Sequence, residues 1–275
     1  MKVTPLSGAL GAEIAGIDLR GLDEAGFGEV YAAFLEHQMI AVRDQALSPD
    51  ELVSVAARFG EISDYPFAKG MEGHPQITEI IKEPEQTSNF GGMWHSDTTY
   101  LPEPPKCTVL HAVETPPRGG DTLFADMYAA FAKLSDGLKS SLRGLKGVST
   151  SNLNAAALRG DHLTSGSMQG TGVEPGTLQA LHPVVRTHPE TGREALYVNP
   201  AHTACFENMT VAESRPLLDH LFAHSIQPEF TSRLSWQPGT LVVWDNRCSQ
   251  HCAINDYDGQ RRVMRRITIA GDVPR

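Results

Sequence analysis

Two side chains that commonly bind metals, His95 and Asp97, are separated by one residue in the segment WHSD. In an extended backbone, alternate side chains lie on the same face, so both groups could reach one ion. His251 is a candidate third ligand, because it follows the strand-like run 240–244 and is expected near the end of a strand. Two imidazoles and one carboxylate form the facial arrangement that leaves open positions on iron(II). The three residues therefore predict a catalytic iron centre.

Two arginines near the C-terminus, Arg262 and Arg266, could bind anions beside that centre. Guanidinium groups bind carboxylates through a planar fork of donors. Strand alternation places both arginines on one face and Arg265 on the other, and the spacing of Arg262 from Arg266 corresponds to about 13 Å along a strand. That distance is enough to hold two different anions. Thr122, in the segment GGDTL, adds a hydroxyl. We expect one anion to be a cosubstrate and the other to be the substrate.

The elements that must position these residues are mostly short strands. Prolines (18) and glycines (25) are spread along the chain, which suits many strands and turns better than a helical bundle. Capping boxes at Ser48 and Thr210 begin two helices, the first of which should end at Gly60. Other helical patterns span 24–37 and 126–134. Strand-like runs occur at 39–43, 76–81, 107–113, 122–125, 183–187, 195–198, 240–244 and 263–270. We predict a single domain over residues 1–275, mainly β with flanking helices (α+β).

The stretch 160–176 is rich in Gly, Ser and Thr and has hardly an apolar side chain. Long loops without secondary structure of their own are usually functional in a compact domain. We expect this stretch to form a mobile active-site lid around residues 155–180.

Composition and charge narrow the class of function. A chain of 275 residues with 40% hydrophobic content can bury a sizeable core. The formal net charge of -10 argues against nucleic acid or an anionic membrane as partner, which favours a small-molecule substrate. The N-terminal segment has the pattern of neither a signal peptide nor a transit sequence. No apolar run approaches the roughly 20 residues that span a bilayer. We expect a cytoplasmic protein.

The cysteines are few and unevenly spaced, which favours reduced thiols over a disulfide framework. They are Cys107, Cys205, Cys248 and Cys252. The last two flank His251 and could form part of a zinc site, but no second ligand pair of that kind accompanies them.

Five segments in order resemble the taurine/2-oxoglutarate dioxygenase family, which includes dioxygenases for alkyl sulfates and phenoxyalkanoates. The resemblance covers nearly the whole chain. The matching segments are 94–100 (WHSDTTY), 119–123 (GGDTL), 182–189 (HPVVRTHP), 244–247 (WDNR) with His251, and 261–266 (RRVMRR).

By that resemblance, His95, Asp97 and His251 match the iron ligands, and Thr122 and Arg262 match the pair that binds 2-oxoglutarate. Arg266 matches the arginine that holds the anionic group of the substrate. The family fold is a double-stranded β-helix, a jelly roll related to the cupins. The implied reaction uses Fe(II), O2 and 2-oxoglutarate to hydroxylate an unactivated carbon, with succinate and CO2 as coproducts. The family also implies a homo-oligomer.

The chain departs from the taurine enzymes around the expected substrate. Tyr65 and Ala68 stand where those enzymes have a histidine and a tyrosine. Met93 ends a Gly91-Gly92-Met93 segment where they place an asparagine, and His202 replaces a phenylalanine. With Arg266 kept but its neighbours changed, we expect a small anionic organic substrate other than taurine. It would be another sulfonate, a sulfate ester or a carboxylate, bound by Arg266, Tyr65, Met93 and His202.

Three alternatives stay open at this point. The metal could be zinc in a metallohydrolase, which would need neither oxygen nor 2-oxoglutarate. The chain could be a noncatalytic jelly-roll binding module. Arg266 could also form a structural ion pair with one of the many acidic residues.

Overall fold

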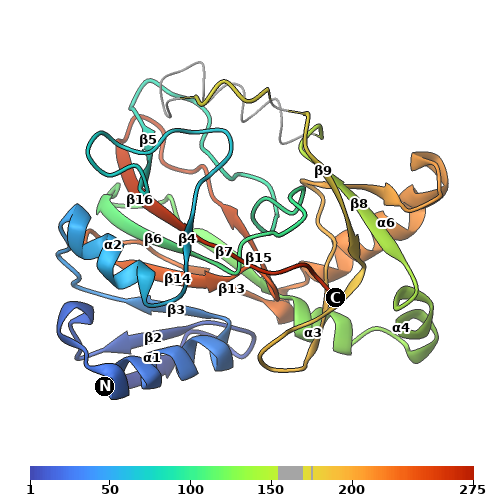
Figure 1. The fold of residues 1–275 in the computed structure, drawn as a ribbon, viewed down its shortest axis with the longest axis horizontal. Coiled ribbons are helices and arrows are strands. Elements are labelled where there is room, and N and C mark those ends of the chain that lie inside the picture. Colours follow the sequence, from blue (N-terminus) through green and yellow to red (C-terminus); the bar gives the residue numbers. More distant parts are fainter. Residues whose placement is uncertain (154–169, 175) are drawn as a thin grey trace.

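A computed structural model describes residues 1–153, 170–174 and 176–275, and strands dominate them (Figure 1). The largest sheet has eight strands in the order β1-β2-β3-β14-β6-β16-β4, with β5 also paired to β16. Its strands are β1 (Lys2–Pro5), β2 (Ala12–Ala15), β3 (Met39–Val42), β4 (Ile62–Ser63), β5 (Thr78–Lys82), β6 (Cys107–Glu114), β14 (Leu241–Asp245) and β16 (Arg262–Ile269).

Smaller antiparallel sheets complete the framework, in the orders β13-β7-β15, β12-β8-β9 and β10-β11. Their strands are β7 (Thr122–Asp126), β8 (Lys146–Thr150), β9 (Gln179–Pro183), β10 (Val185–Thr187), β11 (Glu194–Leu196), β12 (Thr203–Phe206), β13 (Thr231–Leu234) and β15 (Ser249–Ala253). Two short 3-10 turns span Leu19–Gly21 and Pro228–Phe230.

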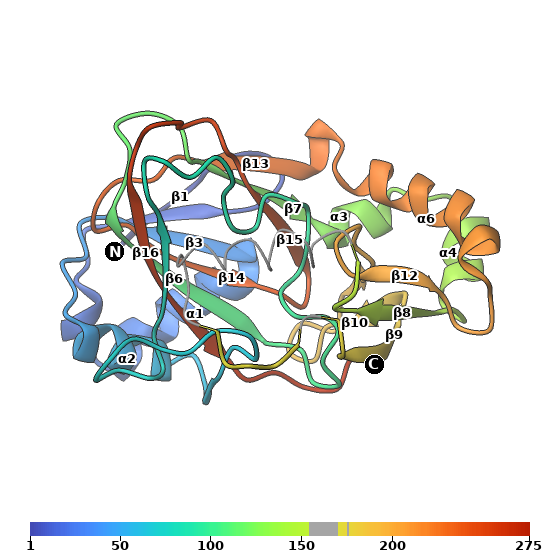
Figure 2. The ribbon, with the colours of Figure 1, turned by 90° about the horizontal axis from the view of Figure 1, so that it is seen from above.

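The helices lie at two ends of the molecule: α1 and α2 beside the large sheet, and α4 and α6 beside β8 and β12 (Figure 2). Their bounds are α1 (Glu24–His37), α2 (Pro49–Ala57), α3 (Met127–Ala132), α4 (Asp136–Leu142) and α6 (Val211–Ser225). Both predicted capping boxes form, Ser48 with Glu51 and Thr210 with Glu213. Each cap stabilises its helix by about 1 kcal/mol.

The two faces of the large sheet have different neighbours, as the alternation along β16 predicts. Ile267 and Ile269 pack with residues of α1 and α2 in one buried core. Met264, on the other face, packs with residues of β7 and β13 in a second core. Arg262 and Arg266 share the face of Met264, whereas Arg265 points away and pairs with Glu79 (Nε to Oε1 3.2 Å). The arginines therefore lie between the large sheet and the sheet β13-β7-β15.

Most predicted elements are confirmed, with three differences. The helix expected to reach Gly60 ends at Ala57. His251 was expected at the end of the strand that became β14, but the chain turns at 246–248 and His251 lies inside the separate strand β15. Several short strands and the helix α4 were not predicted, because their few residues carry too little periodicity to signal a strand or a helix.

The expected lid around 155–180 falls largely on 154–169 and 175, which lie outside the described residues. Where the chain is described again, Gly170 pairs with Ala68 in an antiparallel bridge. The Thr171 amide donates to the Phe67 carbonyl (3.2 Å).

In the described part of the chain, none of the helices has the length and apolar character needed to cross a membrane.

Candidate active site

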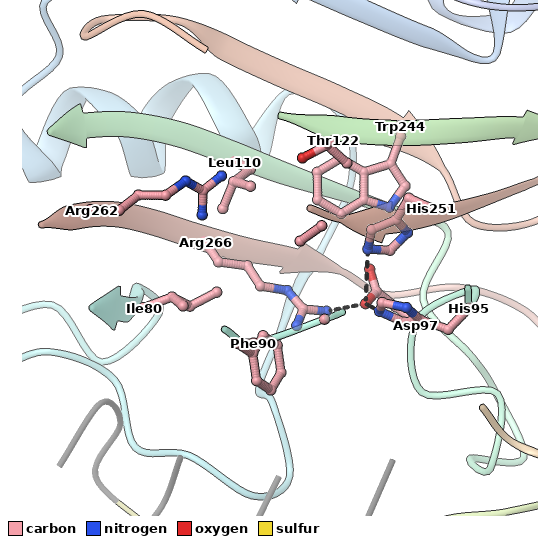
Figure 3. A pocket seen from close by; sticks show the side chains of 12 residues that line it. Ile80, Phe90, His95, Asp97, Leu110, Thr122, Trp244, His251, Arg262 and Arg266 are labelled. Carbon is pink, nitrogen blue, oxygen red and sulfur yellow. Dashed lines mark ion pairs between the residues drawn. The ribbon is translucent and has the colours of Figure 1, made fainter. Parts of the chain in front are cut away.

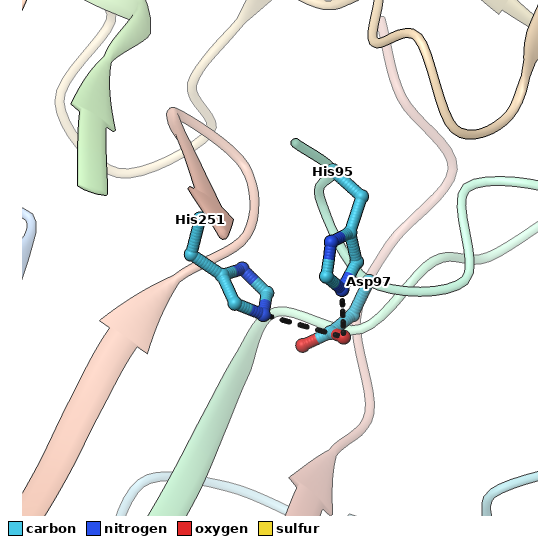
Figure 4. A group of neighbouring side chains, drawn as sticks. All are labelled: His95, Asp97 and His251. Carbon is cyan, nitrogen blue, oxygen red and sulfur yellow. Dashed lines mark ion pairs between the residues drawn. The ribbon is translucent and has the colours of Figure 1, made fainter. Parts of the chain in front are cut away.

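Three predicted ligands converge in space although two lie in one loop and the third in β15 (Figure 4). His95 and His251 form a backbone bridge, in which each amide donates to the other's carbonyl (3.0 and 2.8 Å). This bridge fixes the two imidazoles with their ring centroids 4.1 Å apart. Asp97 Oδ1 lies 3.6 Å from His95 Nε2 and 4.0 Å from His251 Nε2. The ligand atoms all lie within 4.8 Å of one another.

The protonation states of these groups suit a divalent metal. The Nδ1 of His95 lies 2.6 Å from the Met93 carbonyl, which can only accept, so Nδ1 carries a proton and the neutral ring presents its lone pair at Nε2. Burial and the neighbouring His95 hold the pKa of His251 well below its usual value. Burial alone would raise the pKa of Asp97, but Arg266 and the two histidines outweigh it and the carboxyl stays ionised. Two neutral imidazoles and a carboxylate are the donors that metal binding requires.

Arg266 reaches the same carboxylate from β16 (Figure 3). Its Nη2 lies 2.9 Å from Asp97 Oδ1, and both side chains are about 95% buried. The ring of Tyr65 lies under the guanidinium, 5.1 Å from its carbon. Arg266 therefore does pair with an acidic residue, as one alternative held, but that residue belongs to the metal triad. Its buried Nε has no hydrogen-bond partner among the described residues.

Arg262 and Thr122 also line the pocket (Figure 3). Burial lowers the pKa of Arg262, and its buried Nε has no hydrogen-bond partner in the described part of the chain. A buried guanidinium with unused donors is costly unless an anion binds it. Thr122 Oγ1 accepts a hydrogen bond from Trp236 Nε1 (2.9 Å), which leaves its own proton to donate.

One pocket brings together six of the nine predicted site residues. They are His95, Asp97, Thr122, His251, Arg262 and Arg266. Apolar side chains complete the wall, namely Ile80, Phe90, Leu110 and Trp244. A small polar centre inside an apolar wall is the usual composition of a binding site for a small molecule.

The other three predicted residues do not line this pocket but lie next to residues that do. Tyr65 contacts Arg266, and the carbonyl of Met93 accepts from His95. The His202 ring lies 6.0 Å from the His95 ring, with Nδ1 3.1 Å from Thr99 Oγ1. Gly91, just before Met93, does line the pocket and has φ +81°, a conformation that favours glycine.

Sequence reasoning missed Thr108 and Leu110 on β6. Thr108 Oγ1 donates to Asp97 Oδ2 (2.6 Å), and Leu110 lines the pocket. The signal was present, because residues 108, 110 and 112 alternate along a predicted strand and share one face. Which face lies toward the metal depends on how β6 pairs with β14 and β16, and local sequence does not give that.

A second buried group, His188, Asp245 and Cys248, also has its ligand atoms close together. Asp245 already accepts from Arg247 Nε and Nη2 (2.8 and 2.7 Å) and lies 3.0 Å from His188 Nε2. Burial raises the pKa of the Cys248 thiol well above its usual value, which disfavours the thiolate that metals bind. We interpret this group as structural. The zinc site considered for residues 248–252 does not form, because Cys248 groups with Asp245 and His251 groups with Asp97.

Replacing Asp245 with asparagine is expected to destabilise the fold, because it removes one of the two carboxylates that compensate the buried Arg247 charge and leaves only Glu190. We expect the free energy of unfolding to fall by about 3 kcal/mol, or roughly 10 °C in Tm. Burial raises the pKa of Asp245, but Arg247 lowers it further, so the pair stabilises the native state at neutral pH. That stabilisation is lost as the pH falls below about 4. Calorimetry measures both effects, and D18N, which breaks the exposed Asp18–Arg20 pair, is the control that should change little. An equal Tm for D245N and wild type would contradict this interpretation.

A two-histidine, one-carboxylate triad beside two buried arginines, lying between two sheets, defines a non-haem metal-dependent oxygenase. Comparison with known proteins agrees with this class. The chain belongs to the taurine catabolism dioxygenase TauD, TfdA family, whose model matches residues 2–268.

Several similar proteins match almost the whole chain. An alpha-ketoglutarate-dependent sulfate ester dioxygenase of Pseudomonas putida is 32% identical, over 100% of this chain and 91% of that protein. An (S)-phenoxypropionate/alpha-ketoglutarate-dioxygenase of Sphingobium herbicidovorans is 33% identical, over 98% of this chain and 95% of that protein. The crystal structure of a taurine dioxygenase from Burkholderia xenovorans matches with a TM-score of 0.84 and 34% identity, covering 99% of this chain and 92% of that chain.

These comparisons confirm the predicted enzyme class. The chain is a non-haem dioxygenase that depends on Fe(II), 2-oxoglutarate and O2. They do not support the zinc hydrolase or the noncatalytic binding module.

Proposed function

We propose that this dioxygenase hydroxylates a small anionic organic substrate, a sulfate ester, sulfonate or carboxylate other than taurine, and releases succinate and CO2. The observation that supports this most strongly is the pair of buried arginines on one face of β16, both open to the pocket of the metal triad. One guanidinium is available for the cosubstrate and the second for the substrate. The relatives named for sulfate esters and phenoxypropionate, which are anionic compounds, favour the same class.

His95, Asp97 and His251 would hold the iron, and the bound iron would supply the oxygen chemistry that breaks an unactivated C–H bond. Arg262 would bind the distal carboxylate of 2-oxoglutarate through its forked donors. Thr122 would add its hydroxyl proton, because its oxygen already accepts from Trp236. These contacts orient the cosubstrate toward the triad.

Arg266 would hold the substrate's anionic group near the metal, since its guanidinium already lies at Asp97. Tyr65 keeps that guanidinium in place from below. Phe90, Leu110 and Ile80 would exclude water around the target carbon. Met93 and His202 would influence substrate choice through His95, which both of them approach.

Succinate release dependent on substrate tests the proposal directly. The panel contains alkyl sulfates, alkyl and aryl sulfonates, aryloxy carboxylates, taurine and uncharged analogues of the same size. We expect the highest kcat/KM for one of the anions other than taurine. A clear preference for taurine or for an uncharged compound would refute the proposed substrate class and leave the enzyme class intact.

Replacing Arg266 with glutamine is expected to raise the KM for the anionic substrate by about 10- to 100-fold, because a charge-assisted contact is lost. Steady-state kinetics with the best substrate of the panel measures this change. The KM for 2-oxoglutarate should change much less, since Arg262 is retained. Normal substrate affinity with a large loss of Tm would instead identify Arg266 as a purely structural partner of Asp97.

We also propose that the large sheet and the sheet β13-β7-β15 form a double-stranded β-helix, or jelly roll, within a single domain over 1–275. Their facing side chains form one core, and the metal triad and arginines lie between them.

The family resemblance favours a homo-oligomer, and the sequence favours a cytoplasmic location without nucleic-acid or membrane partners. Light scattering on the purified protein measures the oligomeric state, and a monomer would refute that part.

A further inference from the structure

The second oxygen of Asp97 is held by a chain of hydrogen bonds within the large sheet. Thr108, a fully buried residue of β6, donates from Oγ1 to Asp97 Oδ2 at 2.6 Å. Asn246, in the turn after β14, donates from Nδ2 to the same hydroxyl oxygen at 3.1 Å. The first oxygen, Oδ1, faces His95, His251 and Arg266 instead. The two carboxylate oxygens therefore have separate neighbours.

The direction of each hydrogen bond in this chain is fixed. Asn246 Oδ1 accepts from two N–H groups, the indole of Trp244 (3.0 Å) and the amide of Asp97 (3.2 Å). Its NH2 group must then face Thr108, whose oxygen accepts from it. The hydroxyl proton of Thr108 is thereby directed to Asp97, because a carboxylate oxygen can only accept. The amide of Asp97 thus donates to Asn246, and its Oδ2 accepts from Thr108.

We propose that Thr108 and Asn246 are positioning residues that hold Asp97 Oδ2 so that Oδ1 alone is presented to the metal. The inference rests on the proposed role of Asp97 as a metal ligand. A carboxylate that turned both oxygens to the ion would use a position that the cosubstrate or oxygen requires. Thr108 comes from β6 and Asn246 from the turn that follows β14. These strands are neighbours in the middle of the large sheet, so the hydrogen bonds link Asp97 to the centre of that sheet.

Substitution of Thr108 in the full-length enzyme tests the proposal. T108V removes the hydroxyl at nearly constant volume, and T108S keeps it. We expect T108V to weaken Mn(II) binding by about 10- to 100-fold, as removal of a partner that orients a metal ligand typically does. T108S should remain close to wild type. Electron paramagnetic resonance of free and bound Mn(II) measures the affinity without requiring turnover.

A matched control separates positioning from a general loss of stability. Thr268 is also buried and lies opposite Thr108 on β16, so T268V makes the same chemical change in the same sheet. We expect its Mn(II) affinity to equal that of wild type, even if its Tm falls. N246A supplies a second variant in case T108V does not fold, and it should weaken Mn(II) binding in the same range.

The proposal is overturned if T108V and N246A bind Mn(II) as tightly as wild type, or if T108S loses as much affinity as T108V. Loss of Mn(II) affinity in T268V equal to that in T108V would also overturn it. D97N distinguishes a failure of the positioning inference from a failure of the proposed function. If D97N loses Mn(II) and T108V does not, only the positioning inference fails, whereas unchanged binding in D97N removes the metal assignment itself.

Discussion

Replacing Asp97 with asparagine is expected to lower kcat by at least about a thousandfold, since a bound metal ion contributes several kcal/mol to catalysis. Asp97 is the only anionic group of the triad, and its Oδ1 also neutralises Arg266 at 2.9 Å. An amide would bind the metal weakly and would leave the arginine charge uncompensated beside it. Both effects weaken binding of the metal cation. Mn(II) titration and anaerobic Fe(II) reconstitution with 2-oxoglutarate measure the loss, because the weak visible charge-transfer band should disappear.

The loss must be shown in a folded protein, since an uncompensated buried Arg266 also costs stability. Circular dichroism during thermal unfolding establishes whether D97N keeps a cooperative transition. D136N, at the exposed start of α4, should retain wild-type kcat and Mn(II) affinity. Turnover by a folded D97N at more than a tenth of the wild-type rate would show that Asp97 is not a metal ligand.

Replacing Arg262 with glutamine is expected to raise the KM for 2-oxoglutarate by about 30- to 5000-fold, as loss of one partner of a buried charged pair usually costs about 2 to 5 kcal/mol. Arg262 is about 92% buried, and its Nε has no hydrogen-bond partner among the described residues. The bound carboxylate would supply the missing acceptor. Anaerobic titration of the Fe(II) enzyme with 2-oxoglutarate measures the affinity directly.

The same strand offers a matched control. Arg265 lies on the opposite face of β16 and pairs with Glu79, so R265Q removes a guanidinium without touching the pocket. Its KM for 2-oxoglutarate should stay within about threefold of wild type, since Arg265 does not line the pocket and its pair with Glu79 is partly exposed. Mn(II) affinity should be unchanged in R262Q. Equal effects of R262Q and R265Q on 2-oxoglutarate would contradict the assignment.

Sequence patterns predicted the parts of the site that depend on local geometry. The short spacing of His95 and Asp97 predicted that their side chains lie close together, and the alternation along 262–269 separated Arg265 from Arg262 and Arg266. Both features depend on residues that are neighbours in the sequence, and for the arginines the reason is strand alternation. The long helices, with their capping boxes, were predictable for the same reason.

Features that depend on strand pairing could not be predicted. His251 meets His95 because β15 pairs with β7 and extends to a bridge with the loop at His95, a partner 156 positions away in the chain. Arg266 faces Asp97 only because β16 lies beside β6. Which strands pair is decided by packing of the whole core, and a local pattern carries no information about it.

The place of β16 also affects how the enzyme is made. Strand β16 (Arg262–Ile269) lies inside the large sheet between β6 on one side and β4 and β5 on the other. Among the strands that the structure describes, the ribosome synthesises β16 after all the others, and until then the edge of β6 has no neighbour on that side. Exposed strand edges in partly synthesised chains favour aggregation. The nascent enzyme is thus vulnerable until β16 has formed, and the strand that completes this part of the sheet also completes its anion pocket.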